Sequence, residues 1–149
     1  MIPKLLPLAL LFLSPACFRD NVPVQPMPVT HVGHEVIVSE FFSDPPDRRV
    51  NWDGLRIGGY FDFSRYDSLV VTFEAGRVPG GQAQVPLSLK IGPTYYVRAI
   101  VSGQDQAFEY HVLVRQLAKP QSAALTFIVQ DTVSSVLLSN VLVVGWYTE

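Results

Sequence analysis

The sequence is poor in several features that commonly reveal a protein's chemistry, beginning with cysteine. Cys17 is the one cysteine in 149 residues, so no disulfide can form within the chain. Basic residues are also few: eleven against thirteen acidic residues, which gives a formal net charge of −2. Of the eight Arg residues, only Arg48 and Arg49 are adjacent. A chain without a basic patch lacks the electrostatic footprint of nucleic-acid-binding proteins, so we expect no nucleic acid as a partner.

Catalytic signatures are absent as well. The chain contains no Gly-x-Ser-x-Gly motif, and its paired glycines at 58–59 and 80–81 lack the flanking pattern and the Lys of a phosphate-binding loop. His111 has no evident partner for nucleophilic catalysis. No window of helical length shows the i, i+3, i+4, i+7 spacing of apolar residues strongly. The sequence therefore predicts a non-catalytic protein built from strands, and not an enzyme.

The N-terminal stretch indicates where the protein resides. Lys4 gives it a positive charge, and residues 5–13 are almost wholly apolar. This run is too short to cross a bilayer, which requires about 20 residues. A charged start, a short apolar run and then small residues are typical of a cleavable signal peptide, here residues 1–16.

The small residues 14–16 lead directly into Cys17. This order resembles the lipobox of bacterial lipoproteins, although Ser14 stands where that family usually has Leu. The resemblance implies that Cys17 is acylated, becomes the new N-terminus and anchors the protein in a membrane of the cell envelope, with the outer membrane or cell surface expected. Two alternatives stay open: an ordinary signal peptide ending near Ala16, and an uncleaved or cytoplasmic N-terminus.

The segment after the cysteine is rich in proline. Residues 17–30 contain Pro23, Pro26 and Pro28 and show little periodicity. Because proline fixes φ and has no N–H for a sheet, such a segment favours polyproline II and acts as a semi-rigid spacer. We therefore expect a tether over residues 17–30 and one folded domain over residues 31–149. Without residues 1–16 the formal net charge is −3.

The domain reads as a series of short strands. Residues 68–75 alternate cleanly between apolar and mostly polar positions, as a half-buried strand does. Pro, Gly and Asp clusters separate such runs. We expect eight strands, at residues 35–42, 55–63, 68–75, 85–91, 94–102, 108–114, 123–130 and 136–147. Pro86 indicates an edge position or a strand start.

Eight strands at this spacing predict an all-β fold, a jelly-roll β-sandwich of two antiparallel sheets. An up-and-down barrel is the alternative. Two motifs bear on this choice. One is the run from Phe61 to Val71, in which Ser64-Arg65-Tyr66-Asp67-Ser68-Leu69 leads into an expected core strand. In it, Ser64 and Asp67 could bind backbone amides of the turn, and Tyr66 could cover the open end of the sandwich.

The second motif is the run from Val136 to Gly145, with Ser139-Asn140 at its centre. Together the two motifs resemble galactose-binding-like jelly rolls, which include many carbohydrate-binding modules. The resemblance implies a glycan-binding accessory module. In that family the closing strand often contributes to a structural calcium site. Ser139 stands where the family often has Asp, so we assign no cofactor.

Aromatic residues give the clearest functional indication. Sugar rings stack on exposed Trp and Tyr faces while nearby polar groups bind the hydroxyls. Trp52 lies in an expected loop near Asn51 and three charged residues. We therefore predict a ligand-binding site formed by Trp52, Arg49, Asp53 and Arg56. The alternative is that such rings fill the core, as we expect for Tyr110, which shares a face with Phe108 and Val112.

Other candidate sites are weaker. His31 and His34 point to opposite faces if they lie on a strand, so no metal site is assigned to them. The aspartates of the 44–53 region could hold calcium in a loop, but their spacing matches no EF-hand. Three strand glutamates could serve glycoside hydrolysis only if two of them met in a cleft. The aspartates considered for calcium are Asp44, Asp47 and Asp53. The glutamates considered for hydrolysis are Glu40, Glu74 and Glu109.

The sequence thus predicts a non-catalytic, lipid-anchored envelope protein that binds glycans. The alternative is a structural or interaction subunit of an envelope complex. In that case an outward apolar patch of Val70, Leu113 and Ile128 would contact the partner.

Overall fold

Nine β-strands account for most of the chain in the computed structural model, which describes residues 32–42 and 48–149. The predicted signal peptide, Cys17, the predicted tether, His31, Asp44 and Asp47 lie outside the described residues. The strands are β1 (Val32–Phe41), β2 (Arg49–Val50), β3 (Leu55–Phe61), β4 (Ser68–Arg77), β5 (Val85–Ile91), β6 (Tyr95–Val101), β7 (Gln106–Leu113), β8 (Ala123–Val129) and β9 (Val136–Thr148). Two single-turn 3₁₀ helices, η2 (Val114–Gln116) and η3 (Pro120–Ser122), connect β7 to β8.

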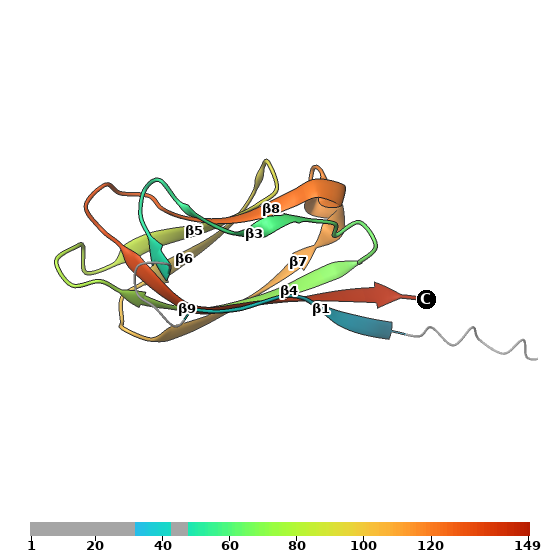
Figure 1. Cartoon of the computed structure of the whole chain (residues 1–149), viewed down its shortest axis with the longest axis horizontal. Helices are drawn as coiled ribbons and strands as arrows, with labels where there is room; N and C mark the ends of the chain where they lie inside the picture. Colours follow the sequence, from blue (N-terminus) through green and yellow to red (C-terminus); the bar gives the residue numbers. More distant parts are fainter. Residues whose placement is uncertain (1–31, 43–47) are drawn as a thin grey trace, which may run out of the picture.

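The strands form two antiparallel sheets that pack face to face (Figure 1). Sheet A has the order β1-β9-β4-β7, with β2 also paired to β9, and sheet B has the order β3-β8-β5-β6. Strands that are consecutive in the sequence therefore alternate between the sheets at most steps, as in a jelly roll. The predicted jelly-roll sandwich is confirmed, and the barrel alternative is wrong because the sheets remain separate.

The core lies between the inner faces of the sheets and follows the strand alternation. On β4, the inward residues Leu69, Val71, Phe73 and Ala75 are at most 1% exposed. On sheet B, β5 and β8 contribute alternating buried residues, and Phe127 meets Phe73 edge to face, with ring centroids 5.0 Å apart. Period-two patterning thus specified which side of β4 and of β8 is buried.

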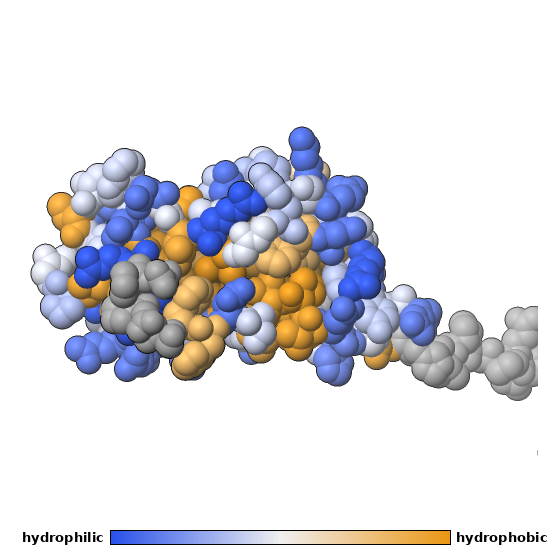
Figure 2. Space-filling model, viewed as in Figure 1, coloured by the Kyte–Doolittle hydropathy of each residue, from blue (hydrophilic) through white to orange (hydrophobic). Residues whose placement is uncertain are grey.

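The sides of the sandwich are less fully covered. In the view of Figure 2, apolar residues gather in the middle of the molecule, between hydrophilic regions near its two ends. Residues of the edge strands β1 and β3 are half-buried and pack against the core, among them Ile37, Leu55 and Phe61. None of the helices in the described ranges has the length and hydropathy needed to span a bilayer.

Strand boundaries differ from the sequence prediction by up to three residues. The two-residue strand β2 was not predicted, because two residues are too few to show a period. The edge position considered for Pro86 is wrong, since β5 pairs with both β6 and β8. Pro86 is the second residue of that strand, so the other option, a strand start, agrees with its position to within one residue.

Candidate functional site

Trp52 lies in the turn between β2 and β3, and its side chain is 63% exposed. The turn closes when Gly54, with φ of 84°, donates its N–H to the Asn51 carbonyl at 3.1 Å. The Asn51 carbonyl also accepts the N–H of Val129, and its side-chain oxygen accepts the Ser135 hydroxyl at 2.7 Å. These bonds fasten the turn to both ends of the β8–β9 connection, so the chain presents the indole from a well-anchored turn.

Of the other residues of the predicted Trp52 site, Asp53 lies in the same turn, whereas Arg49 and Arg56 belong to different sheets. Asp53 is exposed in the same turn. Arg49 pairs with β9 in sheet A, whereas Arg56 pairs with β8 in sheet B. The Arg56 guanidinium lies 4.1 Å from the ring centroid of Tyr60, a cation–π contact within its own sheet. The ligand-binding role of Trp52, Arg49, Asp53 and Arg56 stays a prediction.

A more extensive surface is the outer face of sheet A, which the sequence did not reveal. Because the inward residues of β4 are buried, Val70, Thr72 and Glu74 face outward. In the pairing register, each of these three residues lies beside one residue of β7 and one residue of β9. Glu74 lies beside Asn140 of β9 and Ala107 of β7, and Asn140 lies in turn beside Phe41 of β1.

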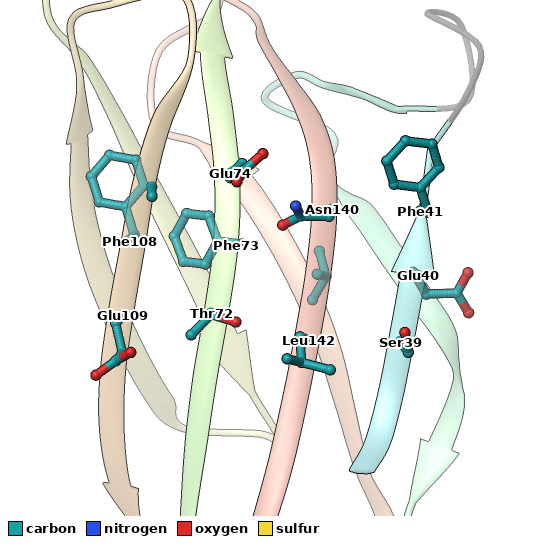
Figure 3. A pocket seen from close by; sticks show the side chains of 12 residues that line it. Ser39, Glu40, Phe41, Thr72, Phe73, Glu74, Phe108, Glu109, Asn140 and Leu142 are labelled. Atoms are coloured by element: carbon teal, nitrogen blue, oxygen red, sulfur yellow. The ribbon is translucent and has the colours of Figure 1, made fainter.

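A hollow of about 420 Å³ lies on this face, which we call the central hollow. It extends over four strands, β1, β9, β4 and β7 (Figure 3). Phe41, which is 80% exposed, stands on the β1 side. The polar residues of its lining are Ser39, Glu40, Thr72, Glu74, Glu109 and Asn140. An exposed aromatic ring beside hydroxyl, amide and carboxylate groups offers both stacking and hydrogen bonding.

The three strand glutamates considered for hydrolysis, Glu40, Glu74 and Glu109, all line the central hollow. Figure 3 shows their carboxylates pointing in different directions, with Glu40 extending past the β1 edge. The Glu109 carboxylate lies 3.1 Å from His111 Nε2. None of the lining residues in the described ranges is Lys or Arg. The hollow is therefore acidic, and the carboxylates lie around it without forming an opposed pair.

A second hollow, of about 640 Å³, lies at one end of the sandwich. Its lining comes from the β3–β4 turn, the end of β7 and the 3₁₀ region, including Asp67, Leu113 and Arg115. We favour the central hollow as the candidate site because four neighbouring strands hold its groups in a fixed register, whereas connecting segments form much of the second one.

Tyr66 seals the same end of the sandwich, as the sequence suggested. It is 4% exposed, and its ring lies against Gly145, where a side chain would collide with it. Its hydroxyl donates to Glu35 Oε2 at 3.0 Å and accepts from Arg65 Nε at 2.9 Å. Arg65 Nη2 donates to the same Glu35 oxygen at 2.7 Å. This triad joins β1 to the β3–β4 turn.

The turn itself is closed by a residue that the sequence prediction missed. Asp62 Oδ1 accepts both the backbone N–H of Ser64, at 2.9 Å, and its hydroxyl, at 2.6 Å. These bonds lower the pKa of Asp62. Asp67 instead contributes its backbone, donating to the Trp146 carbonyl and accepting from Val114. This is an Asx turn, in which the side chain of Asp62 accepts the backbone N–H of Ser64, two residues later.

Burial raises the pKa of the Tyr66 phenol, and the hydrogen bond to Glu35 raises it further, while Arg65 opposes the change. A raised pKa in the folded state makes the stabilisation complete below the ordinary value near 10 and removes it as pH rises through the folded-state pKa. We expect Tyr66→Phe to lower the free energy of unfolding by about 1 kcal/mol at pH 8, through loss of a hydrogen bond. The deficit should shrink as the pH rises above the ordinary phenol pKa of about 10, as measured by urea denaturation.

Tyr110 is the matched control for that experiment. Burial alone raises its pKa, and its hydroxyl donates to the Arg98 carbonyl at 2.9 Å. Tyr110→Phe should likewise make the protein lose less stability at alkaline pH. It should leave the contact between β1 and the β3–β4 turn unchanged. A Tyr66→Phe deficit that stayed constant as the pH rose above about 10 would contradict the role given to the phenol.

The structure offers no metal centre in the residues it describes. No group of three His, Cys, Asp or Glu side chains there could hold a metal ion. His34 faces outward and lies against Trp146, with ring centroids 4.9 Å apart, while Glu35 turns inward to Tyr66. Asp53 is described, but its proposed calcium partners Asp44 and Asp47 are not, so that site stays a prediction.

The predicted apolar patch of Val70, Leu113 and Ile128 is wrong as a single surface. Val70 and Leu113 lie on sheet A, in β4 and β7, whereas Ile128 lies in β8 of sheet B. The outer faces of two stacked sheets point away from each other. Strand order, which the sequence did not reveal, separates Ile128 from the other two.

Comparisons with known proteins give little further guidance. No protein-family model matches the chain, and no curated protein matches it. Among solved structures, it is similar to a family two carbohydrate esterase from Cellvibrio japonicus, with 12% sequence identity and a TM-score of 0.37. The alignment covers 78% of this chain and 34% of the esterase chain, so this chain spans about a third of that structure.

Proposed function

We propose that this domain is a non-catalytic glycan-binding module and that it binds its ligand on the outer face of sheet A. The observation that carries the proposal is the central hollow, where four strands bring Phe41 together with Thr72, Glu74, Glu109 and Asn140. Carboxylates and the amide oxygen accept hydrogen bonds from sugar hydroxyls, and the aromatic ring packs against the apolar face of a sugar.

A binding role suits this arrangement better than glycoside hydrolysis. A hydrolase needs an acid and a second carboxylate placed on either side of the scissile bond. In Figure 3 the carboxylates of the hollow point apart, and one oxygen of Glu109 lies 3.1 Å from His111 Nε2. In this proposal the glutamates act as hydrogen-bond acceptors that orient a ligand.

The lipid anchor forms the second part of the proposal. Cys17 and the Pro-rich segment up to residue 30 lie before β1, which begins at Val32. A diacylated cysteine would hold the domain stably on a membrane, since two acyl chains suffice for this. Mass spectrometry of protein purified from its native membrane should find residues 1–16 absent and Cys17 acylated. An intact Met1 or an unmodified thiol would contradict this part.

The binding surface can be tested by substitution in the hollow. We expect Glu74→Ala and Asn140→Ala each to weaken glycan binding about tenfold, because each removes roughly one hydrogen bond, worth about 1.4 kcal/mol when charge-assisted or well aligned. Both side chains are outside the core, so folding should be little affected. A glycan array would identify the ligand, and calorimetry would then give the affinities.

Two further variants make this test specific. Tyr96→Ala removes an aromatic side chain that is 50% exposed on sheet B, away from the hollow, and should leave binding unchanged. Trp52→Ala discriminates between the two candidate surfaces. A loss of binding confined to Trp52→Ala would transfer the site to the β2–β3 turn, and no binding to any glycan would remove the proposed function.

A further inference from the structure

The part of the outer face next to the central hollow is apolar. Val36, Val70, Leu113, Val144 and Trp146 face outward there, and Leu142 belongs both to this group and to the lining of the hollow. We call these six residues the apolar strip. Val36 is 55% exposed, Leu113 41% and Trp146 36%, so much of this surface is in contact with solvent.

The register makes most of the strip continuous, with Ser68 of β4 lying between Leu113 and Trp146. Val36, Val144 and Val70 lie side by side on β1, β9 and β4. Leu142 comes two residues before Val144 and Trp146 two residues after it, so the three side chains follow one another along the same face of β9. From Leu142 to Trp146 the strip is about 13 Å long, given the rise per residue of a strand.

The two halves of this face differ sharply in charge. The hollow is lined by Glu40, Glu74 and Glu109. None of the six strip residues is charged. His34 and His111 lie beside the strip in the pairing register, and Glu109 lies near its Leu142 end, next to Thr72. A polar, acidic site and an apolar surface therefore share one edge, at Leu142.

The strip is too small to explain as a protein interface by itself. Four strands at the usual spacing span about 14 Å, so its area is roughly 180 Å². A stable interface buries about 800 Å² on each partner. The dimensions suit a single flexible apolar chain that starts in the hollow and lies along β9.

We propose that the ligand is a glycan that bears an apolar chain, such as a lipid-linked or acylated sugar. The sugar occupies the central hollow, and the chain lies over the apolar strip from Leu142 toward Trp146. This inference rests on the proposed function, because it assigns the sugar to the same hollow. It adds the chemical class of the substituent and a second contact surface.

The test uses the full chain with paired methyl and octyl glycosides of glucose, galactose and maltose, kept below the concentration at which the octyl compounds form micelles. We expect the octyl form, which has seven more methylenes, to bind roughly 100-fold tighter than the methyl form of the same sugar. Affinity should rise about twofold for each added methylene, less than the roughly fourfold expected for complete burial, because an open sheet face covers part of the chain. Calorimetry or NMR titration measures the affinities.

Substitutions in the apolar strip test where the octyl chain of the ligand lies. Val70→Thr and Val144→Thr keep the shape and the strand preference of the side chain while adding a hydroxyl, and should remove most of the octyl gain without altering methyl glycoside binding. Ile100→Thr is the matched control, since Ile100 is 51% exposed on β6 in sheet B; it should retain the gain.

Each contrary result has a distinct meaning. Equal binding of methyl and octyl forms would overturn this inference and leave the proposed function intact. No binding of either form, together with no binding to any glycan of the array, would remove both. If the valine variants still bound the octyl glycoside more tightly than the methyl glycoside, the octyl chain would lie on another surface. Equal binding of octanol and octyl glycosides would show that the sugar is not read. A dimer that the valine variants abolish, seen by analytical ultracentrifugation, would identify the strip as a self-association surface.

Discussion

Replacing Phe73 with alanine is expected to lower the free energy of unfolding by about 3–5 kcal/mol, the range for removing a buried phenylalanine. Phe73 is 1% exposed and lies at the centre of the core. Its ring centroid lies 5.1 Å from that of Phe108, 6.0 Å from Tyr110 and 5.0 Å from Phe127. These contacts join β4 and β7 of sheet A to β8 of sheet B, so the cavity would weaken the packing between the sheets.

Phe41→Ala is the matched control for this core variant. It removes the same ring from a position that is 80% exposed, so the change in stability should stay within about 0.5 kcal/mol. Urea denaturation followed by fluorescence gives both values. The two variants should also separate stability from function, since Phe41 lines the central hollow. A loss under about 1 kcal/mol for Phe73→Ala would contradict the central position of this ring in the core.

Gly76→Ala is expected to be the second most damaging change, at about 3 kcal/mol. Gly76 is a buried residue of β4, and a Cβ built there would collide with the backbone carbonyl of Gln104 in the β6–β7 connection. Overpacking ordinarily costs about 1–3 kcal/mol. The upper end applies because a backbone group cannot rotate away as a side chain can. Arg77 also donates its N–H to the Gly103 carbonyl, which holds this connection close to β4.

Gly59→Ala provides the corresponding control in β3. No heavy atom would lie within 4 Å of the added Cβ there, and the residue has no positive φ. The substitution should therefore be neutral, or stabilising by up to about 1 kcal/mol, because it restricts the unfolded chain. Thermal and urea unfolding of the two variants would be compared. Equal destabilisation by both would mean that glycine is needed for another reason than the close approach of Gln104.

The sequence was most informative where a strand buries one face and leaves the other in water. The alternation at residues 68–75 correctly predicted which side chains of β4 enter the core. Tyr110 behaves as expected too, since it packs against the core and its ring lies near that of Phe73. Shorter signals were lost: β2 has only two residues, and the bulges in β1 and β9 interrupt the alternation.

The candidate site was beyond the reach of local patterns. Ser39, Thr72, Glu109 and Asn140 each look like an ordinary outward residue of a separate strand. They line one hollow because β1, β9, β4 and β7 are neighbours in sheet A, although they are widely separated along the chain. The same order placed Ile128 on the opposite outer face from Val70.

The amino-acid sequence by itself determined the all-β fold class of this protein. It specified strands that have an apolar and a polar side and are separated by turns, and the apolar sides must be buried against a second sheet. It also contains the apolar N-terminal run and Cys17, on which our proposal of a lipid anchor rests. Only the tertiary structure decided which strands pair, and therefore that an acidic hollow and an apolar strip adjoin on one face. The physical reason is that side-chain alternation depends on nearest neighbours in the chain, whereas strand order depends on packing and hydrogen bonds between distant segments.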